Sequence, residues 1–288
     1  MSVIVGYQPD QSGADALELG AGVALALHVD LVLAIATPKP WTTPSSARID
    51  AEFAEYAQRY GDHAESAARS QLERRAPGLG VTVHRTAGKT AAKALLEVVS
   101  GTAGDILVVG GNSDSGRMKL GATTGRLLHS SSIPLALAPP GYVCSAITRV
   151  TCAYSGDQNS EQVVAAARDL AERMAVPLRV ATFGVRPAEM FPPEVGMDIE
   201  RNVLAAWQEQ MAAGMAKLKG DGVIGADTPT ALSIGGDWDD ALARVEWAAG
   251  DIIAIGTTPR EPVKRVFLGS RAAKIIAAAQ VPALIFPG

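Results

Sequence analysis

The sequence predicts an α/β protein that consists of two tandem, doubly wound, five-stranded parallel sheets. Short runs of Val, Ile and Leu alternate along the chain with segments of helical spacing, the pattern of a parallel sheet covered by helices on both faces. The 288 residues, 48% of them hydrophobic, supply enough apolar material for two cores. An internal repeat then divides these elements into two sets.

The repeat is clearest in two separated pairs of segments. Residues 105–110 (DILVVG) resemble residues 251–256 (DIIAIG), and residues 133–139 (IPLALAP) resemble residues 281–287 (VPALIFP). Both pairs are offset by about 147 residues, which is half of the chain. The second half is therefore a copy of the first.

A boundary between the copies follows the first repeat. Residues 139–141 (PPG) break helices and suit a junction between domains. We therefore assign residues 1–142 and 147–288 to two copies of one domain. We expect the copies to form an intramolecular pseudo-dimer in which their last strands pair, because such pairing protects open sheet edges.

In the first copy, short apolar runs ended by turn residues predict strands, and apolar residues recurring every three or four positions predict helices. The longest helix carries one apolar stripe that includes Tyr56, Tyr60 and Leu72. The predicted elements are strands at 3–7, 31–36, 81–84, 106–109 and 135–138, and helices at 15–28, 53–72, 91–99 and 123–130.

The second copy repeats this order. Its long helix shows the same stripe, with Val203, Trp207 and Met211 on one face. The predicted elements are strands at 150–154, 178–183, 231–234, 252–255 and 283–286, and helices at 161–174, 199–218, 239–247 and 270–279. In doubly wound sheets, ligands bind beyond the carboxyl ends of the strands, so the loops after strands one and four are the candidate site of each copy.

Composition excludes several classes of function. The net charge of −4 argues against a nucleic-acid or anionic-membrane binder, and an aromatic content of 5% argues against a base-stacking platform. Two cysteines and four histidines without metal-ligand spacing give no support for a structural metal site. The chain starts MSVIVG, without a signal-peptide pattern, so we expect a cytoplasmic protein.

The loop after strand four of the second copy carries the strongest signal for a ligand. Residues 256–270 (GTTPREPVKRVFLGS) start with Gly256 and end in Gly269-Ser270 at the predicted start of a helix. Free N–H groups at such a start attract anions, and Arg260 and Arg271 add positive charge. The alternative is that Ser270 only caps its helix and that the basic residues form a solvated face.

These features resemble the universal stress protein family. The resemblance rests on the repeated βαβα pattern, on strands that end in glycine and on the motif G-x2-G-x9-G-[S/T] before the last helix, and it covers essentially the whole chain. It implies a Rossmann-like, adenine nucleotide alpha hydrolase-like fold and a role in stress response. It further implies that the protein is not an enzyme and that some members bind ATP, with Mg²⁺ only alongside the nucleotide.

This chain departs from the family's ATP-binding pattern in both copies. The family's Asp after strand one is Gln8 in the first copy and Ser155 in the second, and Pro259 replaces a glycine of the motif. In the first copy only seven residues, 114 to 120, separate Ser113, at the fourth position of the loop, from Gly121, where the pattern has nine. The second copy is therefore the stronger candidate. The residues that the resemblance assigns to a nucleotide are Gln8, Gly110, Gly111, Gly121, Thr123, Ser155, Gly256, Thr257, Arg260, Gly269, Ser270 and Arg271.

Three functions stay open at this point. The first is stress-linked regulation through ATP or another adenine nucleotide, or through an unidentified protein partner or a further homodimer. The second is a ligand-free interaction module, and the third is a weak nucleotide hydrolase or nucleotidyl transferase, which fold alone does not exclude. We expect Trp41 and Phe191 to pack as spacers rather than as lids, and Asp105 and Asp251 to be turn residues.

Overall fold

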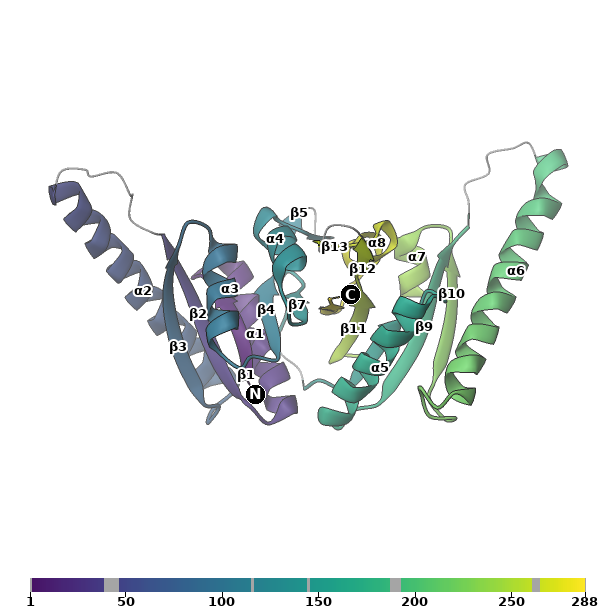
Figure 1. Ribbon diagram of the computed structural model, residues 1–288, viewed down its shortest axis with the longest axis horizontal. Coiled ribbons are helices and arrows are strands. Elements are labelled where there is room, and N and C mark those ends of the chain that lie inside the picture. The colour runs from purple at the N-terminus through teal and green to yellow at the C-terminus, as the bar shows by residue number, and fades with distance from the viewer. Residues whose placement is uncertain are drawn as a thin grey trace. The chain divides into compact units, whose positions relative to one another are not determined.

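A computed structural model describes residues 2–38, 47–114, 117–143, 146–186, 193–260 and 265–287. Two compact units divide the chain, the first made chiefly of residues up to Ala146 and the second chiefly of residues from Ile147 onward. We call these units the first and the second copy (Figure 1). The pairing expected between the last strand of the first copy and the last strand of the second stays a prediction.

The first copy is a five-stranded parallel sheet in the order β7-β4-β1-β2-β3. Helices α1 and α2 pack together on one face, and α3 and α4 pack together on the other (Figure 1). The elements are β1 (Ser2–Tyr7), α1 (Gln11–Leu27), β2 (Asp30–Pro38), α2 (Ala47–Arg75), β3 (Val81–Gly88), α3 (Ala91–Gly101), β4 (Ile106–Gly110), β5 (Asn112–Asp114), β6 (Arg117–Lys119), α4 (Ala122–Ser130) and β7 (Leu135–Ala138).

The second copy has the same topology, with strand order β10-β9-β8-β11-β14. The elements are β8 (Arg149–Ala153), α5 (Gln158–Arg173), β9 (Leu178–Val185), α6 (Pro193–Gly220), β10 (Thr230–Gly235), α7 (Trp238–Ala243), β11 (Asp251–Gly256), β12 (Thr258–Arg260), β13 (Arg265–Phe267), α8 (Ser270–Ala278) and β14 (Ala283–Phe286). The predicted α/β fold of two doubly wound parallel sheets is confirmed.

The central strands form the core of each copy. Val5 of β1 lies between Leu33 of β2 and Val108 of β4, and all three are fully buried. Cys152 of β8 holds the position equivalent to Val5 in the second copy and is also fully buried. The uninterrupted apolar character of these strands follows from helices covering both faces of the sheet.

Aspartates cap the starts of three helices that follow strands of the two sheets. The Asp10 carboxylate accepts a hydrogen bond from the Gly13 amide at 2.9 Å, and Asp157 forms a capping box with Ser160. Asp237 caps α7 by accepting from the Asp240 amide at 2.8 Å. These caps set the first turns of α1, α5 and α7 at the carboxyl ends of the neighbouring strands.

Two local predictions need correction. The sequence pattern did not reveal the short hairpins β5–β6 and β12–β13, which follow strand four in each copy. The helix predicted at 239–247 ends at Ala243. The Trp247 indole folds back on the end of α7, where its Nε1 donates to Leu242 O at 2.8 Å, and Arg149 donates to the Glu246 carbonyl beyond the helix at 3.0 Å.

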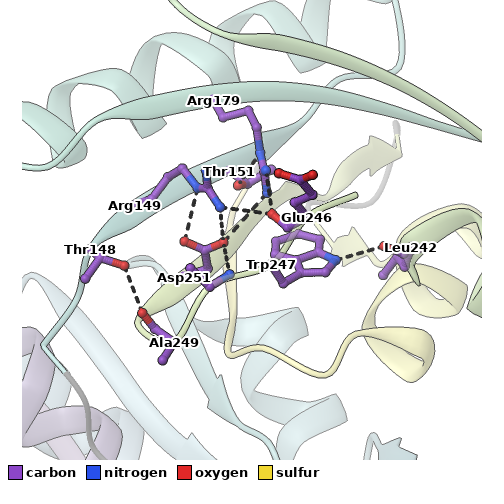
Figure 2. Close-up of polar contacts among 10 residues, drawn as sticks. Thr148, Arg149, Thr151, Arg179, Leu242, Glu246, Trp247, Ala249 and Asp251 are labelled. Atoms are coloured by element: carbon purple, nitrogen blue, oxygen red, sulfur yellow. Dashed lines mark hydrogen bonds and ion pairs between the residues drawn. The ribbon is translucent and has the colours of Figure 1, made fainter. Parts of the chain in front are cut away.

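A buried ionic cluster lies at the amino ends of β8, β9 and β11 (Figure 2). Asp251 is fully buried and accepts from Arg149 Nη2 at 2.6 Å and from the Ala248 amide at 3.0 Å. Arg179 donates to Thr151 Oγ1 at 3.1 Å, and its guanidinium lies 5.0 Å from the Trp247 ring centre. Burial lowers the pKa of Arg179. Asp251 opens strand four as expected and closes the turn before it, since its amide donates to Ala248 O at 3.1 Å; the sequence did not reveal that it is also the buried ion-pair partner of Arg149.

Among the described helices, none is both long enough and apolar enough to pass through a lipid bilayer.

Candidate functional site

A cavity of about 280 Å³ lies at the carboxyl ends of β8, β9 and β11 in the second copy. Its lining comes from the loop after β8, from α6 and α7, and from the start of α8. Of the predicted site residues, the structure brings Ser155, Gly256, Gly269, Ser270 and Arg271 together around this one cavity. This is the position at which doubly wound sheets hold their ligands.

Aromatic and apolar side chains make up much of the cavity wall. Trp207 comes from α6, Trp238 is the first residue of α7, and Phe183 lies near the end of β9. Trp207 packs directly on the backbone of Gly184, where a Cβ would stand 2.6 Å from the indole ring, so only glycine leaves room for it. A planar apolar ring would find several faces to stack on here.

The loop after β8 forms a polar wall. Ser155 Oγ donates to Asp157 Oδ2 at 2.8 Å, so the serine hydroxyl is already held by the residue that caps α5. Below it, Tyr154 is buried, and burial together with the nearby Glu161 charge raises the pKa of its phenol. The Tyr154 phenol therefore stays neutral near pH 7 and contributes no charge to the site.

The start of α8 faces the cavity with unused backbone donors. Gly269 is the N-cap residue, and it makes no side-chain capping hydrogen bond. Ser270 is the first helical residue rather than the cap, so the alternative in which it serves only to cap α8 is wrong. The first N–H groups of a helix have no partner within the helix, and with the exposed Arg271 they give this end of the cavity a positive potential.

Hydrogen bonds join the loop after β11 to α5 and to β14, and Asn159 of α5 also lines the cavity. Asn159, on α5, donates from Nδ2 to the Thr257 carbonyl at 2.8 Å. Thr257 itself is buried, and its hydroxyl donates to the Phe286 carbonyl at 3.1 Å, so it ties β11 to β14 instead of lining the cavity. Arg260 is the last residue of β12, and the structure describes only its backbone.

In the first copy the predicted residues lie at the equivalent strand ends. Gln8 Nε2 donates to Asp10 Oδ2 at 2.7 Å, the same contact that Ser155 makes in the second copy. Gly110 ends β4, and its missing side chain lets the backbone of Ser12 come close. Gly121 is the N-cap residue of α4, again without a side-chain capping bond, and the exposed Thr123 follows in its first turn.

Two side chains fill the space that the glycines of the first copy leave. Met118 of β6 is buried, and a Cβ on Gly111 would stand 2.8 Å from its Cγ. Asn112 of β5 places its side-chain amide against the Cα of Gly121, at the start of α4. The shorter loop therefore folds back as the hairpin β5–β6 over the helix start.

The sequence reasoning missed the aromatic walls of the cavity. Trp207 was assigned only to a helix stripe, and Trp238 to no site at all. A signal for Trp207 existed: it stands where the first copy has Tyr60, so both copies carry an aromatic residue at this point of the long helix. Trp41 and Phe191, which we expect to pack as spacers, lie outside the described residues, as does Cys144.

Metal and thiol chemistry have little support in the part of the chain that the structure describes. No group of three or more His, Cys, Asp or Glu side chains there is arranged to hold a metal ion. Cys152 is fully buried, and burial raises the pKa of its thiol to about 12. It is therefore an unreactive residue of the core at neutral pH.

Comparisons with known proteins agree on one family. The sequence pattern described as "Universal stress protein family" matches residues 1–139 and again residues 146–287. Universal stress proteins of Mycobacterium tuberculosis and Mycobacterium bovis are 38% identical to this chain over 292 residues, with 100% of both chains covered. A universal stress protein from Archaeoglobus fulgidus has the same fold, with a TM-score of 0.64 at 15% identity over 99% of this chain and 98% of that one.

Proposed function

Because this chain belongs to the universal stress protein family, we propose that its second copy binds an adenine nucleotide and that the bound nucleotide regulates a stress response. The single observation that carries this proposal is the shared cavity. Aromatic walls suited to a base and a helix start suited to a phosphate open onto the same 280 Å³. The ligand class follows from these two ends of the site.

The energetics favour a modest affinity. Stacking of a base on an aromatic side chain contributes about 1–3 kcal/mol. A helix N-terminus adds about 0.3–1 kcal/mol for an anion, and up to ~2 kcal/mol when partly buried. Micromolar binding needs about −8 kcal/mol, and Ser155 offers no charge to the ribose or base. We expect dissociation constants from micromolar to millimolar, as befits a sensor of nucleotide level.

Size sets a preference within this class. Pockets for small molecules usually measure about 300–1,000 Å³, so this cavity is at the small end. We therefore expect a mononucleotide to fit better than ATP, and Pro259 of the motif has no N–H to donate to an outer phosphate. Mg²⁺ then enters only as a partner of the phosphates, because the described lining carries Asp157 as its one carboxylate.

The proposed role is binding rather than catalysis, in the cytoplasm. Hydrolysis or nucleotidyl transfer needs a base or a metal ion beside the reacting phosphate. Ser270 and Arg271 line the end of the cavity proposed for the phosphate, and neither is a general base near pH 7. The output of binding is then a change in contacts with a protein partner.

Two measurements test the proposal. Mass spectrometry of the denatured, freshly purified full chain should detect an adenine nucleotide that was carried through purification, or titration calorimetry should register heat for AMP below millimolar concentration. ATP with and without Mg²⁺ is titrated alongside. If no heat appears for either nucleotide at millimolar concentration, the proposal is wrong and the fold acts without this ligand. Phosphate release above a protein-free control would support the hydrolase instead.

A further inference from the structure

We propose that the open edge of β10 is a self-association surface, at which two molecules of this protein join the sheets of their second copies. The proposal is independent of nucleotide binding. It rests on an unpaired strand edge, on the absence of charge along that edge and on its complementarity to a second copy of itself.

The edge offers free backbone groups. Within the described residues, β10 pairs with β9 and is the last strand of its sheet. The Val180 and Arg186 amides donate to the carbonyls of Pro229 and Gly235, both at 3.0 Å, so these carbonyls face β9. Because alternate residues of a strand point the same way, the N–H and C=O groups of Leu232 and Ile234 face the open side.

A groove follows this edge. Its volume is about 700 Å³, and residues 231–234 line it together with Arg179 of β9, Gln208 of α6 and the segment from Arg244 to Glu246, so its charged groups come from outside β10. Leu232 and Ile234 are only half-buried there. An apolar strand edge with room beside it is a template for another strand.

The equivalent edge of the first copy is protected, and β10 is not. Arg85 of β3 lies beside Ile35 in the register of the first copy, as Leu232 lies beside Thr182 in the second, so Arg85 and Leu232 hold equivalent positions. Arg85 donates to Asp62 and to Glu65 of α2, both at 2.7 Å. Charged residues on an edge strand prevent pairing with other strands, whereas β10 reads TALSIG, without a charge.

The sequence of β10 is complementary to itself. When two copies pair antiparallel about an axis at Ser233, Leu232 of one lies opposite Ile234 of the other, on the same face. Both residues present their backbone groups to the open side, so the two resulting pairs exchange about four backbone hydrogen bonds. The apolar side chains then meet as cross-strand neighbours.

Sedimentation equilibrium of the full chain over a range of micromolar concentrations tests the proposal. The wild type should show a monomer–dimer equilibrium, with the apparent mass rising above 29.8 kDa. Leu232→Arg restores the residue of the first copy at this position and brings two like charges to the axis. It should raise the dimer dissociation constant about tenfold or more. Glu209, which takes the place of Asp62, offers the new arginine a partner, so the variant should fold.

Two further variants keep the test specific. Ile234→Pro removes an N–H that faces the open side and not β9, and it should weaken the dimer while leaving the far-UV spectrum unchanged. Ala249→Arg adds the same charge in an exposed loop before β11 and should leave the dimer intact. A wild type that stays monomeric at every concentration, or a dimer insensitive to both edge variants, would overturn the proposal.

Discussion

The two copies share a strand order and differ at the loop after their fourth strand. In the first copy, Met118 and Asn112 of the hairpin occupy the space beside Gly111 and Gly121. In the second copy, the same region opens into a cavity bounded by Gly269 and Trp238. The corresponding glycines of the two copies therefore have different neighbours.

The largest effect on AMP binding should come from a change at the helix start that bounds the cavity. Gly269→Val places a branched side chain at the phosphate end, and we expect calorimetry to detect no binding of AMP. Gly121→Val, the matched change in the first copy, should leave binding unchanged, since there the new side chain displaces only the flexible amide of Asn112. Binding that survives Gly269→Val would place the site elsewhere.

The ionic cluster of the second copy should matter for stability and not for binding. Asp251→Asn leaves Arg149 without its buried carboxylate, and we expect a loss of about 3 kcal/mol in the free energy of unfolding. Asp105→Asn is the matched change in the first copy, where the carboxylate accepts from the Ser2 amide, and it should cost about 1 kcal/mol. Urea unfolding measures both, and equal losses would contradict the difference between the copies.

Removing an aromatic wall should weaken binding without abolishing it. Trp207→Ala should cost about 1–3 kcal/mol of affinity for AMP, which calorimetry measures as an increase in the dissociation constant. Trp207→Tyr, which restores the residue type of Tyr60, should recover most of it. Tyr60→Ala in the first copy serves as the control. A loss of affinity in that control would show that the first copy also binds.

Arg271, the exposed arginine beside the helix start, should contribute less to AMP binding than Trp207. Arg271→Gln should weaken AMP about two- to fivefold, because an exposed ion pair is worth little in water. Adenosine, which has no phosphate, should bind the variant and the wild type equally. The threonine at the matching point of the first copy, Thr123, can be changed to Val without effect on either ligand. An equal loss for AMP and adenosine would assign Arg271 to the base and not to the phosphate.

Cys152→Val should have the smallest effect on the free energy of unfolding at neutral pH. It installs the residue that the first copy has at this position, Val5. Burial raises the thiol pKa from 9.0 to about 12, so the folded state keeps a proton that the unfolded chain loses above pH 9. The wild type should therefore lose stability as the pH rises above 9, by about 1.4 kcal/mol per pH unit. The variant should lack this part of the loss. Denaturant melts between pH 7 and pH 10 that coincide for both would contradict the assignment.

Periodicity and repetition were enough to predict two doubly wound parallel sheets, because burial on both faces imposes apolar runs such as residues 106–109 and 252–255. The preference for the second copy came from its loop motif and stays a prediction. The hairpins escaped prediction because strands of three residues carry no period. The end of α7 at Ala243 was not evident from apolar spacing alone.

The aromatic wall of the cavity was harder to predict than the helix start at its other end. Gly269 and Ser270 are neighbours in the sequence, so a short motif reveals them. Trp207 and Trp238 belong to two different helices, and a single sequence does not indicate that both reach one cavity. The ion pair of Asp251 was missed for the same reason, since its partner Arg149 is 102 residues away.

The Asp15 carboxylate has a practical consequence for anyone who wishes to express one half of this protein. It is buried in α1 and accepts from the amide of Gly141 at 2.9 Å, so a glycine just past the last strand of the first half completes a bond within its interior. A gene fragment that ends at residue 139, where the family match ends, removes the Gly141 amide and leaves the buried Asp15 side chain without one of its hydrogen bonds. Fragments should extend through Tyr142. A higher yield of soluble protein on adding these three residues would show how much this hydrogen bond contributes.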